Sequence, residues 1–154
     1  MSDSHVNIVF QYESNVLDEM TKEILRSRII DKEKGIYQLN AIPHYGPLIA
    51  PGDHFYATYN DFEELEYQHT MAYSGYSVVL VAIIKDGYDV TKIQDVFAEM
   101  DCPSEQINEA YFAMAIPDTA DYGIIQEKLA SLEDEEILNY AEPCLSEEHT
   151  DQKM

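Results

Sequence analysis

The stretch of residues 45–84 constrains the fold most, because apolar residues alternate with polar ones between well-marked turns. It predicts three consecutive β-strands, separated by Gly52, Asn60 and Gly75. The last strand, residues 78–84, is continuously apolar, which is typical of a central strand covered on both faces. A chain with this stretch in its middle is expected to fold around a β-sheet.

Further strands are predicted on the N-terminal side. Alternating apolar residues from Val6 to Tyr12 indicate a half-buried strand. Residues 23–30 are compatible with a strand or a short helix, and residues 35–43 with a strand that Pro43 ends. The Ser74-Gly75 pair predicts a tight hairpin between residues 63–73 and residues 78–84.

The apolar spacing changes to about 3.6 residues in the second half, which predicts two amphipathic helices. Asp89 or Thr91 can cap the first helix, and Asp118 or Thr119 the second. The expected buried stripes are Val90, Ile93, Val96, Phe97 and Met100, then Ile124, Ile125, Leu129 and Leu132. Residues 111–116 and 137–141 are predicted strands.

This order of elements predicts an α+β fold. A curled antiparallel β-sheet is followed by a β-α-β-α-β segment, with the two helices packed on one face. The absence of a long linker predicts a single α+β domain over residues 1–145. Residues 146–154 are expected to form a flexible acidic tail.

The charge balance narrows the possible partners. Nine lysines and arginines stand against thirty acids, so the formal net charge is −21. Nucleic acid is excluded as a partner because phosphate binding needs clustered bases, and an anionic membrane is disfavoured for the same reason. Residues 86–154 contain eighteen acids and three lysines, so most of the field comes from there. The acidity can serve solubility alone or attraction of a basic partner.

The cysteines and the N-terminus indicate the compartment. Two cysteines, Cys102 and Cys144, suit a reducing environment better than a disulfide scaffold. The first ten residues lack the basic and apolar regions of a signal peptide, and residues 78–84 are too few to span a bilayer. A cytoplasmic protein is therefore expected.

The sequence contains no recognisable catalytic motif. The spacing of His44, His54 and His69 matches no compact metal signature, and the glycines occur singly, without a phosphate-binding pattern. Cys102 follows a predicted helix rather than preceding one, and Cys144 lies among acids, so nothing favours either thiolate. The sequence predicts no catalytic residue, no metal and no cofactor, and hence a protein that is not an enzyme.

Several short segments resemble DUF4265, a bacterial family of domains of unknown function. They are Tyr37-Gln38-Leu39 running into Pro43, Gly52-Asp53, Ser74-Gly75-Tyr76-Ser77 and Cys144-Leu145. The similarity covers roughly residues 23–145. Ala41, His44 and Tyr76 depart from the family pattern, which has Asn, Phe and His at these places. The resemblance implies a stand-alone soluble bacterial domain and no established activity.

Tyrosines and acids share the strands of residues 53–67. Tyrosine is favoured at the centres of protein interfaces, and carboxylates beside it complement lysine and arginine through ion pairs and cation–π contacts. The predicted partner-binding residues are Asp53, Tyr56, Tyr59, Asp61, Glu63, Glu64, Glu66 and Tyr67. Residues 133–136, all acidic, form a reserve candidate.

The leading hypothesis is a small acidic inhibitor of a basic protein. The best-suited case is an immunity protein that masks the active or nucleic-acid-binding surface of a cationic, nuclease-like bacterial toxin domain. The alternative is a small-molecule-binding or enzymatic domain with a site near His44, Asp53 and His54. A third possibility is a regulatory or scaffold domain whose acidity serves only solubility.

Overall fold

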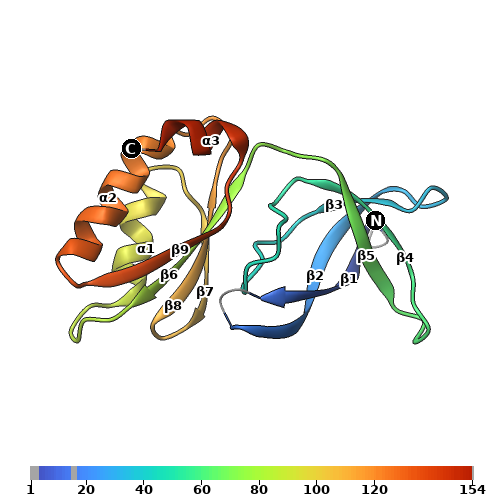
Figure 1. Ribbon diagram of the computed structural model, residues 1–154, viewed down its shortest axis with the longest axis horizontal. Coiled ribbons are helices and arrows are strands. Elements are labelled where there is room, and N and C mark those ends of the chain that lie inside the picture. The colour runs from blue at the N-terminus through green and yellow to red at the C-terminus, as the bar shows by residue number, and fades with distance from the viewer. Residues whose placement is uncertain (1–3, 15–16, 154) are drawn as a thin grey trace.

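The computed structural model describes residues 4–14 and 17–153, which form a five-stranded barrel followed by a four-stranded sheet with three helices (Figure 1). The predicted α+β class is confirmed. We call residues 5–72 the barrel half and residues 77–152 the sheet half. The two halves lie at opposite ends of the long axis of the molecule (Figure 1).

The barrel is an antiparallel meander closed on itself. Its strands are β1 (His5–Ser14), β2 (Glu19–Asp31), β3 (Ile36–Leu39), β4 (His54–Tyr59) and β5 (Leu65–Ala72). Because five strands alternate in direction, the first and the last must run parallel, and they close the barrel where Val9 pairs with Glu66. Residues 23–30 thus belong to a strand, the first of their two predicted alternatives.

Inward-facing side chains fill the barrel. The buried cluster is Ile8, Phe10, Leu25, Tyr37, Leu39, Ile49, Phe55 and Ala57. Phe10 and Phe55 meet edge to face, with ring centroids 5.3 Å apart, a favoured aromatic geometry. Val6, Ile8, Phe10 and Tyr12 all pack in or against this cluster, as their alternation predicts.

The sheet half has a β-α-β-β-α-β order like that of ferredoxin-like folds. Its elements are β6 (Ser77–Ile83), α1 (Val90–Ala98), β7 (Ser104–Asn108), β8 (Tyr111–Ile116), α2 (Tyr122–Asp134), β9 (Leu138–Cys144) and α3 (Glu147–Gln152). The strands pair antiparallel in the order β7-β8-β6-β9. Strand β7 was not predicted, because its sequence SEQIN is mostly polar.

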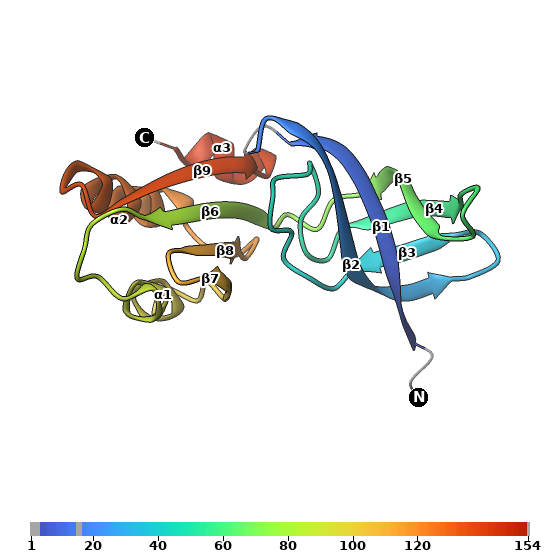
Figure 2. The ribbon, with the colours of Figure 1, turned by 90° about the horizontal axis from the view of Figure 1, so that it is seen from below.

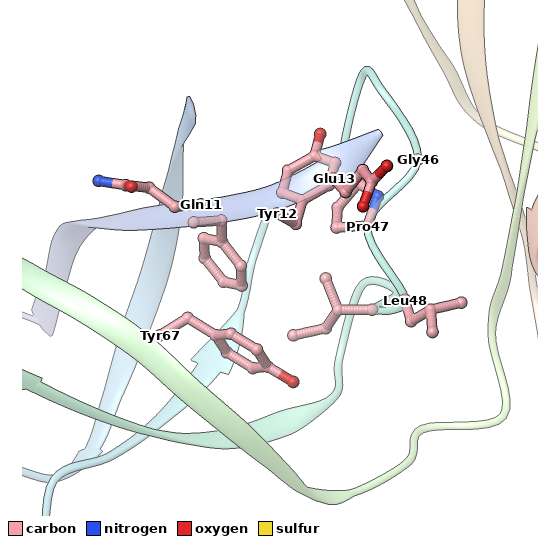
Figure 3. Close-up of a pocket in the computed structure, with 9 residues that line it drawn as sticks. Gln11, Tyr12, Glu13, Gly46, Pro47, Leu48 and Tyr67 are labelled. Carbon is pink, nitrogen blue, oxygen red and sulfur yellow. The ribbon is translucent and has the colours of Figure 1, made fainter. Parts of the chain in front are cut away.

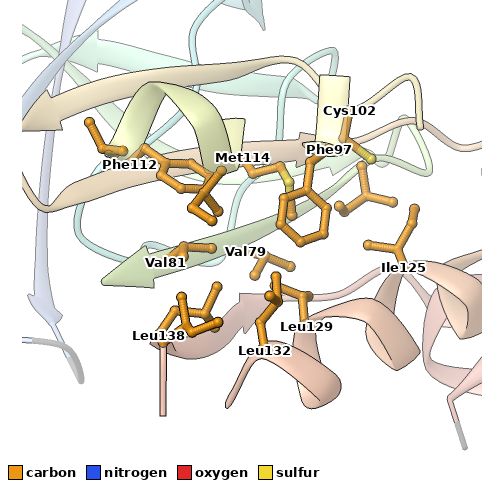
Figure 4. Packing of buried hydrophobic residues seen from close by; sticks show 14 of the residues in the cluster. Val79, Val81, Phe97, Cys102, Phe112, Met114, Ile125, Leu129, Leu132 and Leu138 are labelled. Carbon is orange, nitrogen blue, oxygen red and sulfur yellow. The ribbon is translucent and has the colours of Figure 1, made fainter. Parts of the chain in front are cut away.

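Strand β6 is covered on both faces, as its apolar run predicts. Val79 and Val81 point to α1 and α2, where Phe97 and Leu129 complete the main core (Figure 4). Val78 and Leu80 point the other way and pack with Ala50 of the barrel half in a smaller cluster. Figure 1 shows α1 and α2 on one side of this strand layer and the barrel on the other.

The predicted hairpin across Ser74 and Gly75 is wrong. Strand β5 belongs to the barrel and β6 to the other sheet, so the turn is the passage between the two halves. The Asp53 carboxylate accepts a hydrogen bond from the backbone N–H of Ser74 at 2.8 Å, which ties the start of β4 to this passage. Local alternation identifies two strands, but it cannot say that they join different sheets.

The C-terminal segment also differs from its prediction. Residues 146–154 were expected to be a flexible tail, whereas Glu147–Gln152 form α3, capped by Ser146. The His149 side chain is fully buried, and its Nδ1 lies 2.6 Å from Ser77 Oγ. In α2, Asp121 rather than Asp118 or Thr119 caps the helix, and Ile124 is exposed, so the buried stripe begins at Tyr122.

Candidate functional site

The turn between β4 and β5 is rigidly hydrogen-bonded. Asn60 Oδ1 accepts from the backbone N–H groups of Phe62 (2.8 Å) and Glu64 (3.0 Å). The Asn60 backbone N–H donates to the Glu64 carbonyl at 2.8 Å, and that of Glu63 to the Asn60 carbonyl. Glu63 has a positive φ of 61°, a conformation that a non-glycine residue adopts only when its surroundings hold it there.

This turn presents two aromatic side chains to solvent. Phe62 is 80% exposed and Tyr59 is 69% exposed, and Asp61 and Glu63 stand exposed between and beside them. We call Tyr59, Asp61, Phe62, Glu63 and Glu64 the turn surface. Aromatic residues are enriched among those that dominate protein interfaces, so the turn surface is a candidate protein-binding surface.

Four of the eight predicted contact residues gather in the turn surface, namely Tyr59, Asp61, Glu63 and Glu64. Glu66 lies beside them, because Asn60 Nδ2 donates to its Oε1 at 3.0 Å. Lys22 of β2 reaches Glu64 at 3.2 Å, so a lysine from elsewhere in the chain enters the acidic surface. Phe62 was not among the predicted contact residues. The signal that could have found it is its place in a turn rather than in an alternating strand.

The remaining predicted contact residues lie elsewhere. Asp53 is only 1% exposed and accepts from the backbone N–H groups of Ala50 and Ser74, so its prediction as a contact residue is wrong. The two backbone donors offset part of the cost of burying this acid, and composition does not reveal them. Tyr56 is half-buried on β4, with its ring 5.3 Å from that of His69.

Tyr67 points into the barrel seam instead of the acidic face. Its ring stacks on Phe10 with centroids 4.8 Å apart, and its hydroxyl lies 2.8 Å from Thr70 Oγ1. Around it, β1 and the loop at Pro47 and Leu48 line a pocket of about 310 Å³ (Figure 3). Tyr67 is thus a packing residue at the seam, with its ring edge open to the pocket.

The three residues of the alternative site are dispersed. His44 Nε2 lies 3.3 Å from Glu105 Oε1 of β7, whereas His54 is on β4 and the Asp53 carboxylate is buried against Ser74. The pocket that Asp53 lines contains neither histidine. Among the described residues, no group of three or more histidines, cysteines and acids could hold a metal ion.

A pocket of about 580 Å³ lies at the junction of the two halves, and the sequence did not predict it. We call it the junction pocket. Its lining is Leu48, Asp53, Tyr73, Ser74, Gly75, Tyr76, Asp118, Cys144, Leu145, Ser146, Glu147 and Glu148. Acids and tyrosines contribute much of this lining and no lysine or arginine does, so the pocket is complementary to cationic groups.

The segments that resemble DUF4265 explain why the junction pocket has its shape. Gly75 has a positive φ of 93°, and a Cβ there would lie 2.8 Å from that of Asp118. Ser74 Oγ donates to the Pro51 carbonyl at 2.7 Å and accepts from the Tyr76 backbone N–H at 3.1 Å. Ser74, Gly75 and Tyr76 are far from Cys144 in the sequence. The crossing between the halves brings them to the same pocket as Cys144.

The thiols are not activated in this arrangement. Burial, with a smaller contribution from Asp53, raises the pKa of Cys144 to about 12. Burial, with a smaller contribution from Asp101, raises the pKa of Cys102 to about 12 as well. Both side chains are therefore protonated at neutral pH and poor nucleophiles.

The reserve candidate lies far from the turn surface. Residues 133–136 are exposed at the C-terminal end of α2. That end of α2 and the β4–β5 turn are at opposite ends of the molecule in Figure 1, so one partner of ordinary size would not cover both. Among the described helices, none has the length and apolar character needed to cross a membrane.

Comparison with known proteins bears on fold and family. A solved structure described as a "Novel crystal structure of a hypothetical protein from Neisseria gonorrhoeae" is similar, with a TM-score of 0.78 and 21% sequence identity. The alignment covers 91% of this chain and 94% of that one, and at this identity it shows the shared fold alone. No curated protein matches the chain. The model of a family described as "Domain of unknown function (DUF4265)" matches residues 25–140, and the chain belongs to that family.

Proposed function

We propose that this protein is a small protein-binding inhibitor that engages a basic partner through its turn surface. The observation that supports this most is Phe62, which is 80% exposed on a turn fixed by Asn60 and flanked by acids. A turn that is already ordered loses little conformational entropy when it binds. Burying a side chain such as Phe62 contributes about 1.5–3 kcal/mol.

Charge supports a basic partner. The net charge of −21 accelerates encounter with a cationic protein. Asp61 and Glu63 are exposed beside Phe62, where a lysine or arginine of the partner could pair with them as the aromatic ring is covered. The junction pocket, with Asp118, Glu147 and Glu148 in its lining, offers a second acidic surface to the same class of partner.

The partner class that fits best is a cationic, nuclease-like bacterial toxin domain. Such a domain needs a basic surface to hold nucleic acid, and an acidic protein that covers this surface would inhibit it without any chemistry of its own. We therefore propose an immunity protein that neutralises a toxin of this kind by masking its active or nucleic-acid-binding surface.

The test is direct binding to the products of the neighbouring genes. A basic domain among them should bind this chain with nanomolar affinity, as measured by calorimetry, and lose its nuclease activity in the complex. Phe62→Ala should weaken binding about ten-fold or more, since central aromatic residues dominate interface energy. Ile124→Ala is the matched control, because Ile124 is 58% exposed on α2 and outside the turn surface.

Two outcomes would exclude the proposal. One is the absence of nanomolar binding to any basic domain encoded beside the gene. The other is an equal loss of affinity in the Phe62 and Ile124 variants, which would place the contact away from the turn surface.

A further inference from the structure

The outer face of β2 is basic and apolar, unlike the rest of this acidic molecule. Side chains alternate along a strand, and every second residue of β2 from Met20 to Ile30 is exposed. We call these residues the arginine face. They are Met20, Lys22, Ile24, Arg26, Arg28 and Ile30. Figure 2 shows β1 and β2 as a long paired ribbon across the barrel.

Among the residues that the structure describes, the two arginines of this face have no acidic partner. Arg28 lies opposite His5 of β1 and Gln38 of β3, and Arg26 lies opposite Asn7 of β1. No ion pair among the described residues includes either arginine. In a chain with thirty acids, two adjacent unpaired guanidinium groups form a localised site for an anion.

Apolar side chains lie next to the charged ones on this face. Met20 is 67% exposed, Ile24 is 59% exposed and Ile30 is 43% exposed, all on this one strand face. Around the two arginines both edges of β2 are occupied, by β1, by β3 and by Asn40, whose backbone N–H donates to the Arg26 carbonyl, so no added strand can bind there. A partner must therefore dock through side chains that meet the arginines and the aliphatic groups together.

We propose that the arginine face binds an acidic peptide segment of another protein, in which two Asp or Glu residues lie two positions apart and an aliphatic residue lies two positions before the first and two positions after the second. Carboxylates pair with the guanidinium forks in bidentate fashion, while aliphatic side chains cover Ile24 and Ile30. Arg26 and Arg28 are separated by about 6.6 Å along the strand, which is also the spacing of alternate residues in an extended peptide. This contact lies outside the turn surface and would serve a second partner.

Other occupants fit less well. A symmetric pair of copies would bring the same patch of each together and set arginines against arginines. Nucleic-acid binding gains affinity from each neutralised phosphate, and the two arginines offer few such contacts. An anionic membrane yields about 1 kcal/mol for each base near its surface, and this face has fewer bases than a membrane-binding cluster needs.

The experiment measures fluorescence anisotropy of labelled probes against the full chain at physiological ionic strength. The probes are the peptide Leu-Ser-Glu-Ser-Glu-Ser-Leu (the Glu-Leu peptide), the same peptide with serine in place of leucine (the Glu-Ser peptide), a single-stranded oligonucleotide and vesicles containing phosphatidylserine. We expect saturable binding of the Glu-Leu peptide, and weaker binding of the Glu-Ser peptide because Ile24 and Ile30 then stay uncovered.

Charge reversal tests the assignment. Arg26→Glu/Arg28→Glu should weaken binding of the Glu-Leu peptide about ten-fold or more, since each charge-assisted pair is among the strong hydrogen bonds. The control Lys92→Glu/Lys128→Glu makes the same change in net charge on exposed lysines of α1 and α2, and should have little effect. Circular dichroism confirms that both variants are folded.

Ile24→Thr/Ile30→Thr retains strand propensity and tests the apolar part, with an expected loss of several-fold. Phe62→Ala should leave peptide binding unchanged, which separates this proposal from the turn surface. The proposal is overturned if the Glu-Leu peptide does not bind, or if both charge reversals weaken it equally. It is also overturned if only the oligonucleotide or the vesicles bind in a manner that Arg26 and Arg28 control.

Discussion

The barrel half and the sheet half differ in two properties, the number of exposed hydrophobic side chains and the net charge. Among the described residues, eight of the twelve large hydrophobic side chains that are exposed lie in the barrel half. They are Leu17, Met20, Ile24, Ile30, Leu48, Tyr59, Phe62 and Met71. Residues 86–154, in contrast, carry eighteen acids and three lysines, which gives −15 of the net charge of −21.

The difference follows from how each half buries its strands. The sheet half has α1 and α2 over one face, and the barrel half contributes Ala50 to the other. The barrel turns one face of each strand inward, and the outward face has no helix over it. The barrel half is thus free to expose apolar contact residues, while the sheet half supplies the long-range field that attracts a basic partner.

The strongest test of this comparison removes one buried ring from each half. Phe97 of α1 and Phe55 of β4 are both fully buried. Phe97→Ala should lower the free energy of unfolding by about 3–5 kcal/mol, as measured by urea denaturation. Phe55→Ala should cost less, towards about 3 kcal/mol, because the seam pocket beside Tyr67 lets the barrel relax.

Amide hydrogen exchange of the same two variants tests the predicted single domain. If the halves unfold together, each substitution should lower protection in both of them equally. Loss of protection in β1–β5 alone after Phe55→Ala would show that the barrel half unfolds independently, and the single-domain prediction would be wrong.

The next effect concerns the crossing between the halves. Asp53→Ala leaves the buried N–H groups of Ala50 and Ser74 without their acceptor, and should cost about 2–3 kcal/mol. Asp53→Asn keeps one acceptor oxygen and should cost less. Urea denaturation of the two variants at neutral pH measures this difference, and an Ala variant as stable as the Asn variant would contradict it.

The same carboxyl predicts a pH dependence. Burial raises the pKa of Asp53 above its ordinary value of 3.8, despite the hydrogen bonds from Ser74 and Ala50 that lower it. The folded state therefore binds the proton more tightly than the unfolded state does. This contribution to the free energy of unfolding is fully present below pH 3.8 and is lost as the pH rises through the pKa of the folded state. Wild type should lose stability relative to Asp53→Asn as pH rises through this window.

A smaller effect is expected where α3 docks. Ser77 Oγ lies 2.6 Å from His149 Nδ1 and accepts from the Ser146 backbone N–H at 2.7 Å. Ser77→Ala should cost about 1–3 kcal/mol, because both groups lose a buried partner. Hydrogen exchange should rise in Glu147–Gln152 before it rises in α2. Unchanged protection of α3 would show that packing against Tyr122, rather than Ser77, holds it.

Sequence patterns predicted the elements better than their assembly. The continuous apolar run of β6 and the helical spacing of α1 are local signals, and both elements are present. The split of the strands into barrel and sheet depends on long-range pairing, which alternation does not encode, so the Ser74-Gly75 hairpin was wrongly expected. Likewise, nothing in the polar sequence of α3 shows that His149 would be buried.

The candidate site was predicted in part for a related reason. Acids and tyrosines on one stretch identified the β4–β5 turn, yet strand alternation sends Tyr67 inward and backbone donors draw Asp53 into the junction. Arg26 and Arg28 were counted only as part of the net charge. Whether these arginines are paired with acids depends on their neighbours across the strands, such as Asn7 and Gln38. Those neighbours are known only once the strand register is known.

The smallest expected effect belongs to the exposed ion pair between the arginine face and the turn surface. Lys22 Nζ and Glu64 Oε2 are 3.2 Å apart, with their side chains 47% and 34% exposed. A double-mutant cycle with Lys22→Met and Glu64→Gln should give a coupling of about 0.2–1 kcal/mol in urea denaturation, falling as salt is added. A larger, salt-insensitive coupling would mean that the pair holds the β4–β5 turn in place.

In that case Lys22 as well as Asn60 would fix the orientation of Phe62, and Lys22→Met would weaken binding of a basic partner. We expect instead that Lys22→Met removes one cation and leaves the turn intact, because Asn60 makes its hydrogen bonds to the turn backbone independently of Lys22.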